Sequence, residues 1–135
     1  MDTQLFTPAD IVYSYTRKQA LEDGEQVLLE GELGEMARSR PIGYKYPVYL
    51  TRSVWALVEM AASNKKHCND VKGVIWDILW MSRTYCRPLD PMTTEFRLTI
   101  TGTGRRRLHT LIIQCGPTDI DDPAPCLTVM HPSEM

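Results

Sequence analysis

The spacing of apolar residues changes at Pro88 and Pro91, and this change divides the chain into a helical part and a β part. Before the prolines, apolar residues recur on one face of two segments with the three-to-four-residue spacing of an α-helix. After them, Phe96, Leu98 and Ile100 alternate with polar residues, as on a strand with one buried face. Proline lacks a backbone N–H and therefore ends the helical stretch. We expect an α+β fold, with helices before this point and a sheet after it.

Two long helices are predicted before the prolines. Thr51 can cap the first helix, of roughly a dozen residues, and Trp55 is among its apolar positions. Asp70 can cap the second helix, which we expect to run to about Cys86. A hydroxyl cap, good helix formers and a closing glycine predict a short first helix within residues 14–24.

The remaining segments are shorter and less regular. Residues 27–29 predict a brief extended piece, and the glycine-containing residues 31–43 predict a loop with one helical turn at residues 33–38. Residues 102–104 mark a hairpin turn, and residues 126–130 predict a third antiparallel strand. The expected fold is α+β, with two long helices and a short N-terminal helix packed on a small antiparallel β-meander.

The length of 135 residues suits one domain, and we expect residues 1–135 to form a single compact domain. A content of 43% hydrophobic and 24% charged residues is typical of a globular protein rather than a disordered one. The apolar runs are too short to span a membrane, and residues 1–6 lack the pattern of a secretion signal. We therefore expect a cytoplasmic protein without a membrane partner, whose four cysteines are free thiols.

The net charge is small, but the charged residues are unevenly distributed along the chain. The formal net charge of −2 argues against a generic DNA-coating protein, whose affinity comes from many cationic contacts with phosphate. Acidic residues are concentrated within residues 22–35 and arginines within residues 83–107. This distribution predicts two faces of opposite charge.

Tryptophan and arginine side chains supply the predicted binding surface. On an ideal helix one stripe would hold four of them, Trp76, Trp80, Arg83 and Arg87. Three adjacent arginines at the hairpin tip can grip phosphate or carboxylate groups: Arg105, Arg106 and Arg107. Tryptophan and arginine are the residues that most often anchor interfaces, so we predict that all of these bind a partner. Burial of the tryptophans in the core and a merely solubilising role for the arginine tip are the alternatives.

No catalytic residue, metal or cofactor is predicted. Cys115, Cys126 and His131, completed by His67 or His109, lack the Cys-x-x-Cys spacing of a zinc site. A nucleophilic pair of a cysteine and a histidine would need the two side chains to meet in space, which the spacing does not reveal. A small hydrolase or modifying enzyme that uses such a pair is an alternative function.

Several motifs resemble, in the same order, a family of small uncharacterised bacterial, plasmid and phage proteins classed as a domain of unknown function. They are SYTRKQALEDG from Ser14, YPVxLTRxVW from Tyr46, DILWMSR from Asp77 and CGP from Cys115. Mobile elements often encode compact inhibitors of host defence. The resemblance therefore implies a non-enzymatic inhibitor from a phage or other mobile element, which binds a bacterial defence complex sterically in the host cytoplasm.

A CRISPR effector is the expected target of such an inhibitor, so the expected activity is of the anti-CRISPR type. A third possible function is weak nucleic-acid binding through the arginine-rich hairpin tip. The oligomeric state is not indicated by the sequence.

Overall fold

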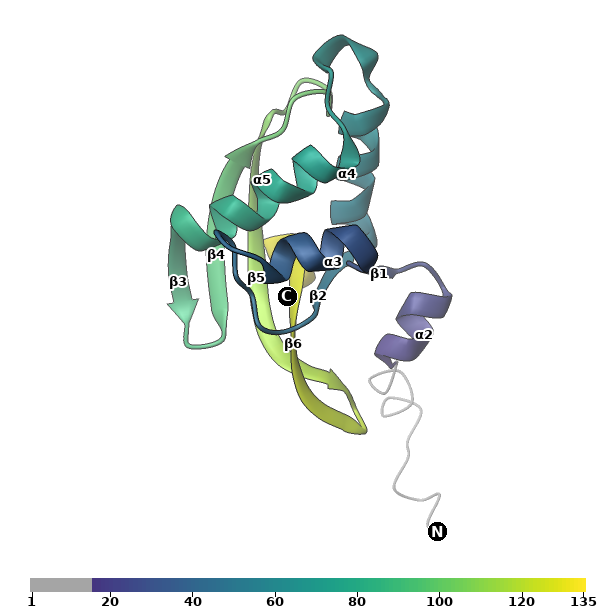
Figure 1. Cartoon of the computed structure of the whole chain (residues 1–135), viewed down its shortest axis with the longest axis vertical. Coiled ribbons are helices and arrows are strands. Elements are labelled where there is room, and N and C mark those ends of the chain that lie inside the picture. Colours follow the sequence, from purple (N-terminus) through teal and green to yellow (C-terminus); the bar gives the residue numbers. More distant parts are fainter. Residues whose placement is uncertain (1–15) are drawn as a thin grey trace.

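The computed structural model describes residues 16–135 and has a six-stranded mixed sheet at its centre (Figure 1). In chain order the strands are β1 (Gln26–Leu28), β2 (Val48–Thr51), β3 (Cys86–Asp90), β4 (Thr93–Thr99), β5 (Leu108–Asp119) and β6 (Asp122–Met130). Their order across the sheet is β1-β2-β6-β5-β4-β3, so β1 and β3 form its edges. β2 and β6 run parallel, and the other neighbouring strands run antiparallel.

Three of the helices, α3, α4 and α5, cover one face of this sheet (Figure 1). The described helices are α2 (Arg17–Glu22), α3 (Gly31–Arg38), α4 (Arg52–Ser63) and α5 (Val71–Thr84), with two 3₁₀ turns, η2 (Lys65–His67) and η3 (Pro132–Glu134). Side chains of α3, α4 and α5 meet inward-facing strand residues in one core. Its fully buried members include Leu50, Val54, Val58, Ile75, Ile78, Leu79, Leu111 and Val129. Burial of such side chains is the main stabilising contribution to a fold of this kind.

The predicted fold, with two long helices and a short N-terminal helix on a small antiparallel meander, is wrong. Within residues 16–135 the sheet has six strands and is mixed, and the four α-helices described there are short, the longest being the 14 residues of α5. β2 is only 4 residues long and leads directly into α4, so its apolar residues resemble the start of the helix. β3 contains Pro88, which is tolerated because β3 is an edge strand.

Both helices predicted before the prolines are confirmed in position. α4 begins directly after Thr51, but the Thr51 side chain does not cap it. α5 begins after Asp70, whose carboxylate accepts a hydrogen bond from the backbone N–H of Gly73 at 2.8 Å. α5 ends at Thr84, slightly before the predicted end at Cys86. The hairpin of β4 and β5 and the later strand β6 are also confirmed.

Two further predictions concern the start of the described chain, the helix within residues 14–24 and the loop of residues 31–43. α2 confirms the first helix and its hydroxyl cap, which is Thr16, in a capping box with Gln19; residues 14 and 15 of the predicted segment lie outside the described residues. The helical turn predicted at residues 33–38, within a segment otherwise predicted as loop, is confirmed and is longer than predicted, since α3 spans Gly31–Arg38. Gly34 is needed there for close packing, since a Cβ atom would lie 2.7 Å from the carbonyl oxygen of Leu29. Within residues 16–135, no helix combines the length and the apolar character needed to cross a membrane.

Candidate functional site

The structure brings the two predicted tryptophans together on α5. The rings of Trp76 and Trp80 stack with their centroids 5.3 Å apart and an interplanar angle of 16°. Both side chains are half-buried and pack against the core. Much of the surface of the two tryptophans therefore packs against the core, which was the alternative to partner binding, and only a part of it faces solvent.

The two arginines of the predicted stripe are placed differently from each other. Arg83 lies over the ring of Tyr44, 4.9 Å from its centroid, and its Nε donates to the carbonyl oxygen of Ile42 at 3.0 Å. Arg87 is not on the helix at all, because α5 ends at Thr84. It lies on β3, where it forms an ion pair of 2.9 Å with Glu95. The stripe therefore does not extend to Arg87.

Exposed apolar side chains lie close to these arginines in the chain, before, on and after β3. Tyr85 is 69% exposed, Leu89 43% and Met92 59%. We call this surface the α5–β3 corner, defined by Arg83, Tyr85, Arg87, Leu89 and Met92. A hollow of about 580 Å³ opens there, lined by Thr84, Tyr85, Cys86, Arg87, Glu95, Phe96 and Arg97. Tyr85, Leu89 and Met92 were not predicted as binding residues. Their apolar character next to Pro88 and Pro91 was the feature of the sequence that could have indicated an exposed apolar surface.

The arginine tip lies elsewhere on the molecule. Arg105, Arg106 and Arg107 are exposed in the loop that joins β4 to β5, as the hairpin prediction required. This loop follows the end of β4 at Thr99, whereas Met92 precedes its start. The tip and the α5–β3 corner are thus separate surfaces: the tip follows the end of β4, whereas the corner runs from the end of α5 along β3 to the turn before β4 (Figure 1).

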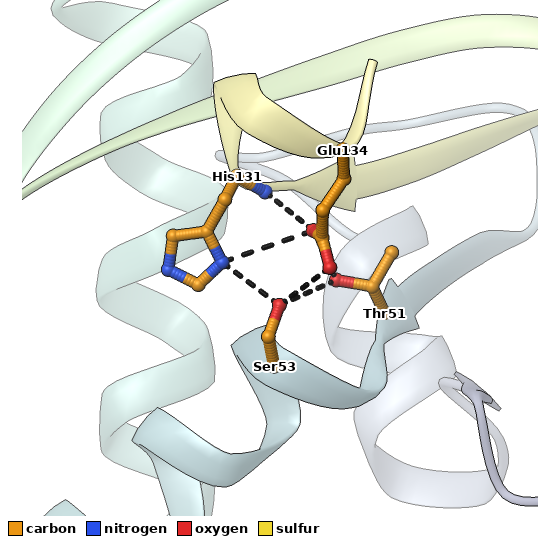
Figure 2. A network of polar contacts seen from close by, with 4 residues as sticks. All are labelled: Thr51, Ser53, His131 and Glu134. Carbon is orange, nitrogen blue, oxygen red and sulfur yellow. Dashed lines mark hydrogen bonds and ion pairs between the residues drawn. The ribbon is translucent and has the colours of Figure 1, made fainter.

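A polar network that the sequence analysis missed joins the start of α4 to the segment after β6 (Figure 2). The Ser53 hydroxyl donates to Oε1 of Glu134 at 2.7 Å, and the Thr51 hydroxyl donates to Oε2 at 2.9 Å. The backbone N–H of His131 donates to the same Oε2 at 2.7 Å. Ser53 Oγ also lies 2.8 Å from Nδ1 of His131. Since the Ser53 proton is directed to Glu134, His131 must be the donor in this last contact.

This network does not have the arrangement of a hydrolytic triad. In a triad the serine donates to the imidazole, and the acid binds the other imidazole nitrogen. Here Ser53 donates to the carboxylate, and Nδ1 of His131 is the ring nitrogen nearer Glu134, at 3.8 Å from Oε2. Burial by itself raises the pKa of Glu134, but the hydrogen bonds from Ser53, His131 and Thr51 outweigh it and hold the pKa below its ordinary value. The network therefore stabilises a carboxylate and fastens η3 to α4.

The remaining candidate chemistry is not assembled in the described part of the chain. Within residues 16–135, no cysteine thiol makes a hydrogen bond to a histidine; Cys68 and Cys126 instead contact backbone carbonyl oxygens. His109 is buried, and its Nε2 lies 3.0 Å from the Thr103 hydroxyl. Nor does this part of the chain hold a group of three or more histidine, cysteine or acidic side chains able to bind a metal ion.

Comparison with known proteins gives a family but no function. A family model described as "Family of unknown function (DUF6573)" matches residues 1–135. No curated protein matches the chain, and no solved structure matches it.

Proposed function

The chain belongs to this family of unknown function (DUF6573), and we propose that it acts without catalysis, by binding another protein through the α5–β3 corner. Family membership confirms the predicted resemblance to an uncharacterised family. The bacterial, plasmid or phage origin that the motifs suggest remains a prediction.

The observation that carries the proposal is the exposure of Tyr85, Leu89 and Met92 within one short stretch of chain. Large apolar side chains grouped on a surface are typical of a protein interaction site. Tyrosine and arginine are enriched among the residues that dominate binding energy, and Arg83 and Arg87 flank Tyr85 in the sequence. The neighbouring hollow of about 580 Å³ offers space for side chains of a partner.

Recognition at this corner depends on side chains more than on the open strand edge. All five residues of β3 are exposed, and β3 lies at the edge of the sheet. An exposed edge can accept an added strand, but Pro88 has no N–H to donate. The ion pair of Arg87 with Glu95 also holds a charged side chain at this edge. We therefore expect a folded partner surface rather than an extended peptide.

We propose further that the partner is a protein complex of bacterial defence, with CRISPR effectors first, and that binding blocks it sterically in the host cytoplasm. The support for this partner is the predicted origin of the chain in a phage or plasmid, which its motifs suggest. The support for steric action is that the described residues assemble no cysteine and histidine pair and no metal group.

The test is co-purification of the tagged full chain from bacteria that express a CRISPR effector complex, with nuclease treatment and mass spectrometry. The variant Tyr85→Ser/Met92→Ser removes the two most exposed apolar side chains of the corner. A matched control is Leu108→Ser/Ile120→Ser, because these side chains are 57% and 67% exposed at other places. The wild type and the control should retain the complex in stoichiometric amount, and the corner variant should lose it. Retention by the corner variant, or no retention by the wild type, contradicts the proposal.

A further inference from the structure

A second surface, independent of the α5–β3 corner, forms where η2 meets the loop between β4 and β5 (Figure 1). The side-chain amide of Asn69 donates to the Thr101 carbonyl oxygen at 2.9 Å and lies 3.1 Å from the Thr101 hydroxyl. Gly102 packs against the end of α4, where a Cβ atom would lie 3.2 Å from Cβ of Asn64 and 3.3 Å from Cα of Ala61. The two segments are therefore held against each other.

This contact unites two groups of basic side chains that the sequence separates. η2 contributes Lys65 and Lys66, and the loop contributes Arg105, Arg106 and Arg107. All five are exposed, and we call this surface the cationic end. The ion pairs found within residues 16–135 use other cations: Arg52, Lys72, Arg87 and His131. The nearby acid Asp70 is engaged in capping α5.

The loop presents its arginines from a fixed backbone. The N–H of Ile100 donates to the carbonyl oxygen of Arg107 at 2.8 Å. The Thr103 hydroxyl lies 2.9 Å from the carbonyl oxygen of Ile100 and 3.0 Å from that of Arg106. A preorganised loop loses less conformational entropy when it binds.

The formal net charge of −2 does not describe this end of the molecule. β5 begins directly after Arg107 and ends in the turn that carries Asp119, Asp121 and Asp122. Figure 1 shows these two turns at opposite ends of the long axis. Because exposed charges are screened beyond about 8 Å in physiological salt, the acidic turn does not cancel the cationic end.

We propose that the cationic end binds the phosphate backbone of duplex nucleic acid, without reading the bases. Residues 64–70 and 100–107 contain no phenylalanine, tyrosine or tryptophan, so neither segment can stack such a ring on an unpaired base as single-strand binders do. No large apolar side chain is exposed within the two segments, although Leu108, which directly follows Arg107, is 57% exposed. One such side chain does not form the apolar centre that a protein interface needs. Closely spaced arginines and lysines without these features suit repeated phosphate groups.

The experiment is a fluorescence anisotropy titration of a labelled mixed-sequence DNA duplex with the full chain at several salt concentrations. If all five cations contact phosphate, the plot of log affinity against log salt should have a slope of about −4 to −5. Binding should then weaken by two to three orders of magnitude between about 50 and 200 mM salt.

Two variants divide the surface. Arg105→Gln/Arg106→Gln/Arg107→Gln should make the slope shallower by about 3, and Lys65→Gln/Lys66→Gln by about 2. The matched control Lys18→Gln/Arg38→Gln/Lys45→Gln removes three exposed cations outside the cationic end and should leave the slope unchanged. Thermal melting confirms that each variant is folded.

Three outcomes would overturn the inference: no binding of the duplex at about 50 mM salt, equal losses in the control and the arginine variant, or tighter binding of the single strand. Displacement by polyglutamate as effective as by unlabelled duplex would assign the surface to an acidic protein instead. Tyr85→Ser/Met92→Ser should bind the duplex like the wild type, so failure of this inference and failure of the proposed protein binding are distinguishable.

Discussion

The Ser53 hydroxyl lies 2.8 Å from Nδ1 of His131, although 78 positions separate the two residues in the chain. The parallel pairing of β2 with β6 explains this proximity. Leu50 is paired with Val129, so the residues that follow the two parallel strands lie side by side at the C-terminal ends of β2 and β6. Glu134 then reaches back to Ser53 and completes the network in Figure 2.

Replacing Ser53 with alanine should lower the free energy of unfolding by roughly 1 kcal/mol, because the Glu134 carboxylate loses a charge-assisted hydrogen bond. Urea denaturation followed by circular dichroism measures this change. Ser63→Ala is the control, since Ser63 is also on α4 but donates only to the carbonyl oxygen of Met60. Equal losses in the two variants would mean that the network contributes nothing specific.

The contribution of Glu134 should depend on pH. Its pKa in the folded state is below the ordinary 4.5, so the carboxylate stabilises the fold above that pH, and this stabilisation is lost as pH falls through the folded-state pKa. Glu134→Gln should therefore be less stable than the wild type at about pH 6, and the difference should shrink toward about pH 3. Asp119 also has a lowered pKa, chiefly through the backbone N–H of Ile120, and is common to both proteins. Urea titrations at several pH values test this; a difference independent of pH would contradict it.

His109 should become protonated at a lower pH than a free histidine. Burial lowers its pKa, the neighbouring His131 and Arg106 side chains lower it further, and a hydrogen bond to the Arg106 backbone offsets part of this. The folded state should accordingly lose stability relative to the unfolded state as pH falls from about 6.5. An NMR titration of the imidazole protons should give a midpoint below 6.5, the ordinary value. A midpoint at or above that value would show that His109 is solvated or paired with an acid.

Gly102 and Gly104 should tolerate alanine differently, although both have left-handed backbone angles, with φ of +88° and +89°. Gly104→Ala meets open space and should cost only the backbone strain, about 1 to 2 kcal/mol. Gly102→Ala adds a clash with α4 at Ala61 and should cost clearly more. Thermal and urea denaturation of the two variants provide the comparison. Equal destabilisation would indicate that the loop can move away from α4 without penalty.

Local features of the fold could be predicted from the sequence, and long-range pairing could not. Asp70 caps α5 as expected, because an N-cap depends on residues only three positions apart. The hairpin of β4 and β5 follows from alternation and a glycine turn, which are also local. The pairing of Leu50 with Val129 left no local signal, and without it neither the mixed sheet nor the strand character of β2 could be recognised.

The candidate surfaces show the same limit. The exposed position of Arg106 at a hairpin tip was predictable from the sequence. That Lys65 belongs to the same surface was not, because it depends on the contact of Asn69 with Thr101. Arg87 was assigned to a helix because helical spacing continued past the true end of α5 at Thr84. α5 ends there and β3 begins, because Cys86 pairs with Phe96 of β4. A helix end set by strand pairing is not visible in the spacing of apolar residues.

The place of β6 between β2 and β5 also has a consequence for the order in which the protein can fold. The ribosome synthesises β2 long before β6. Val48 and Leu50, which are buried in the folded protein, therefore cannot pair with β6 until almost the whole chain has been made. Closing so long a loop costs entropy before any contact compensates for it, and such topologies fold slowly. In the nascent chain β2 can pair with β1, but its other edge stays open until β6 arrives, and an open strand edge is prone to aggregation.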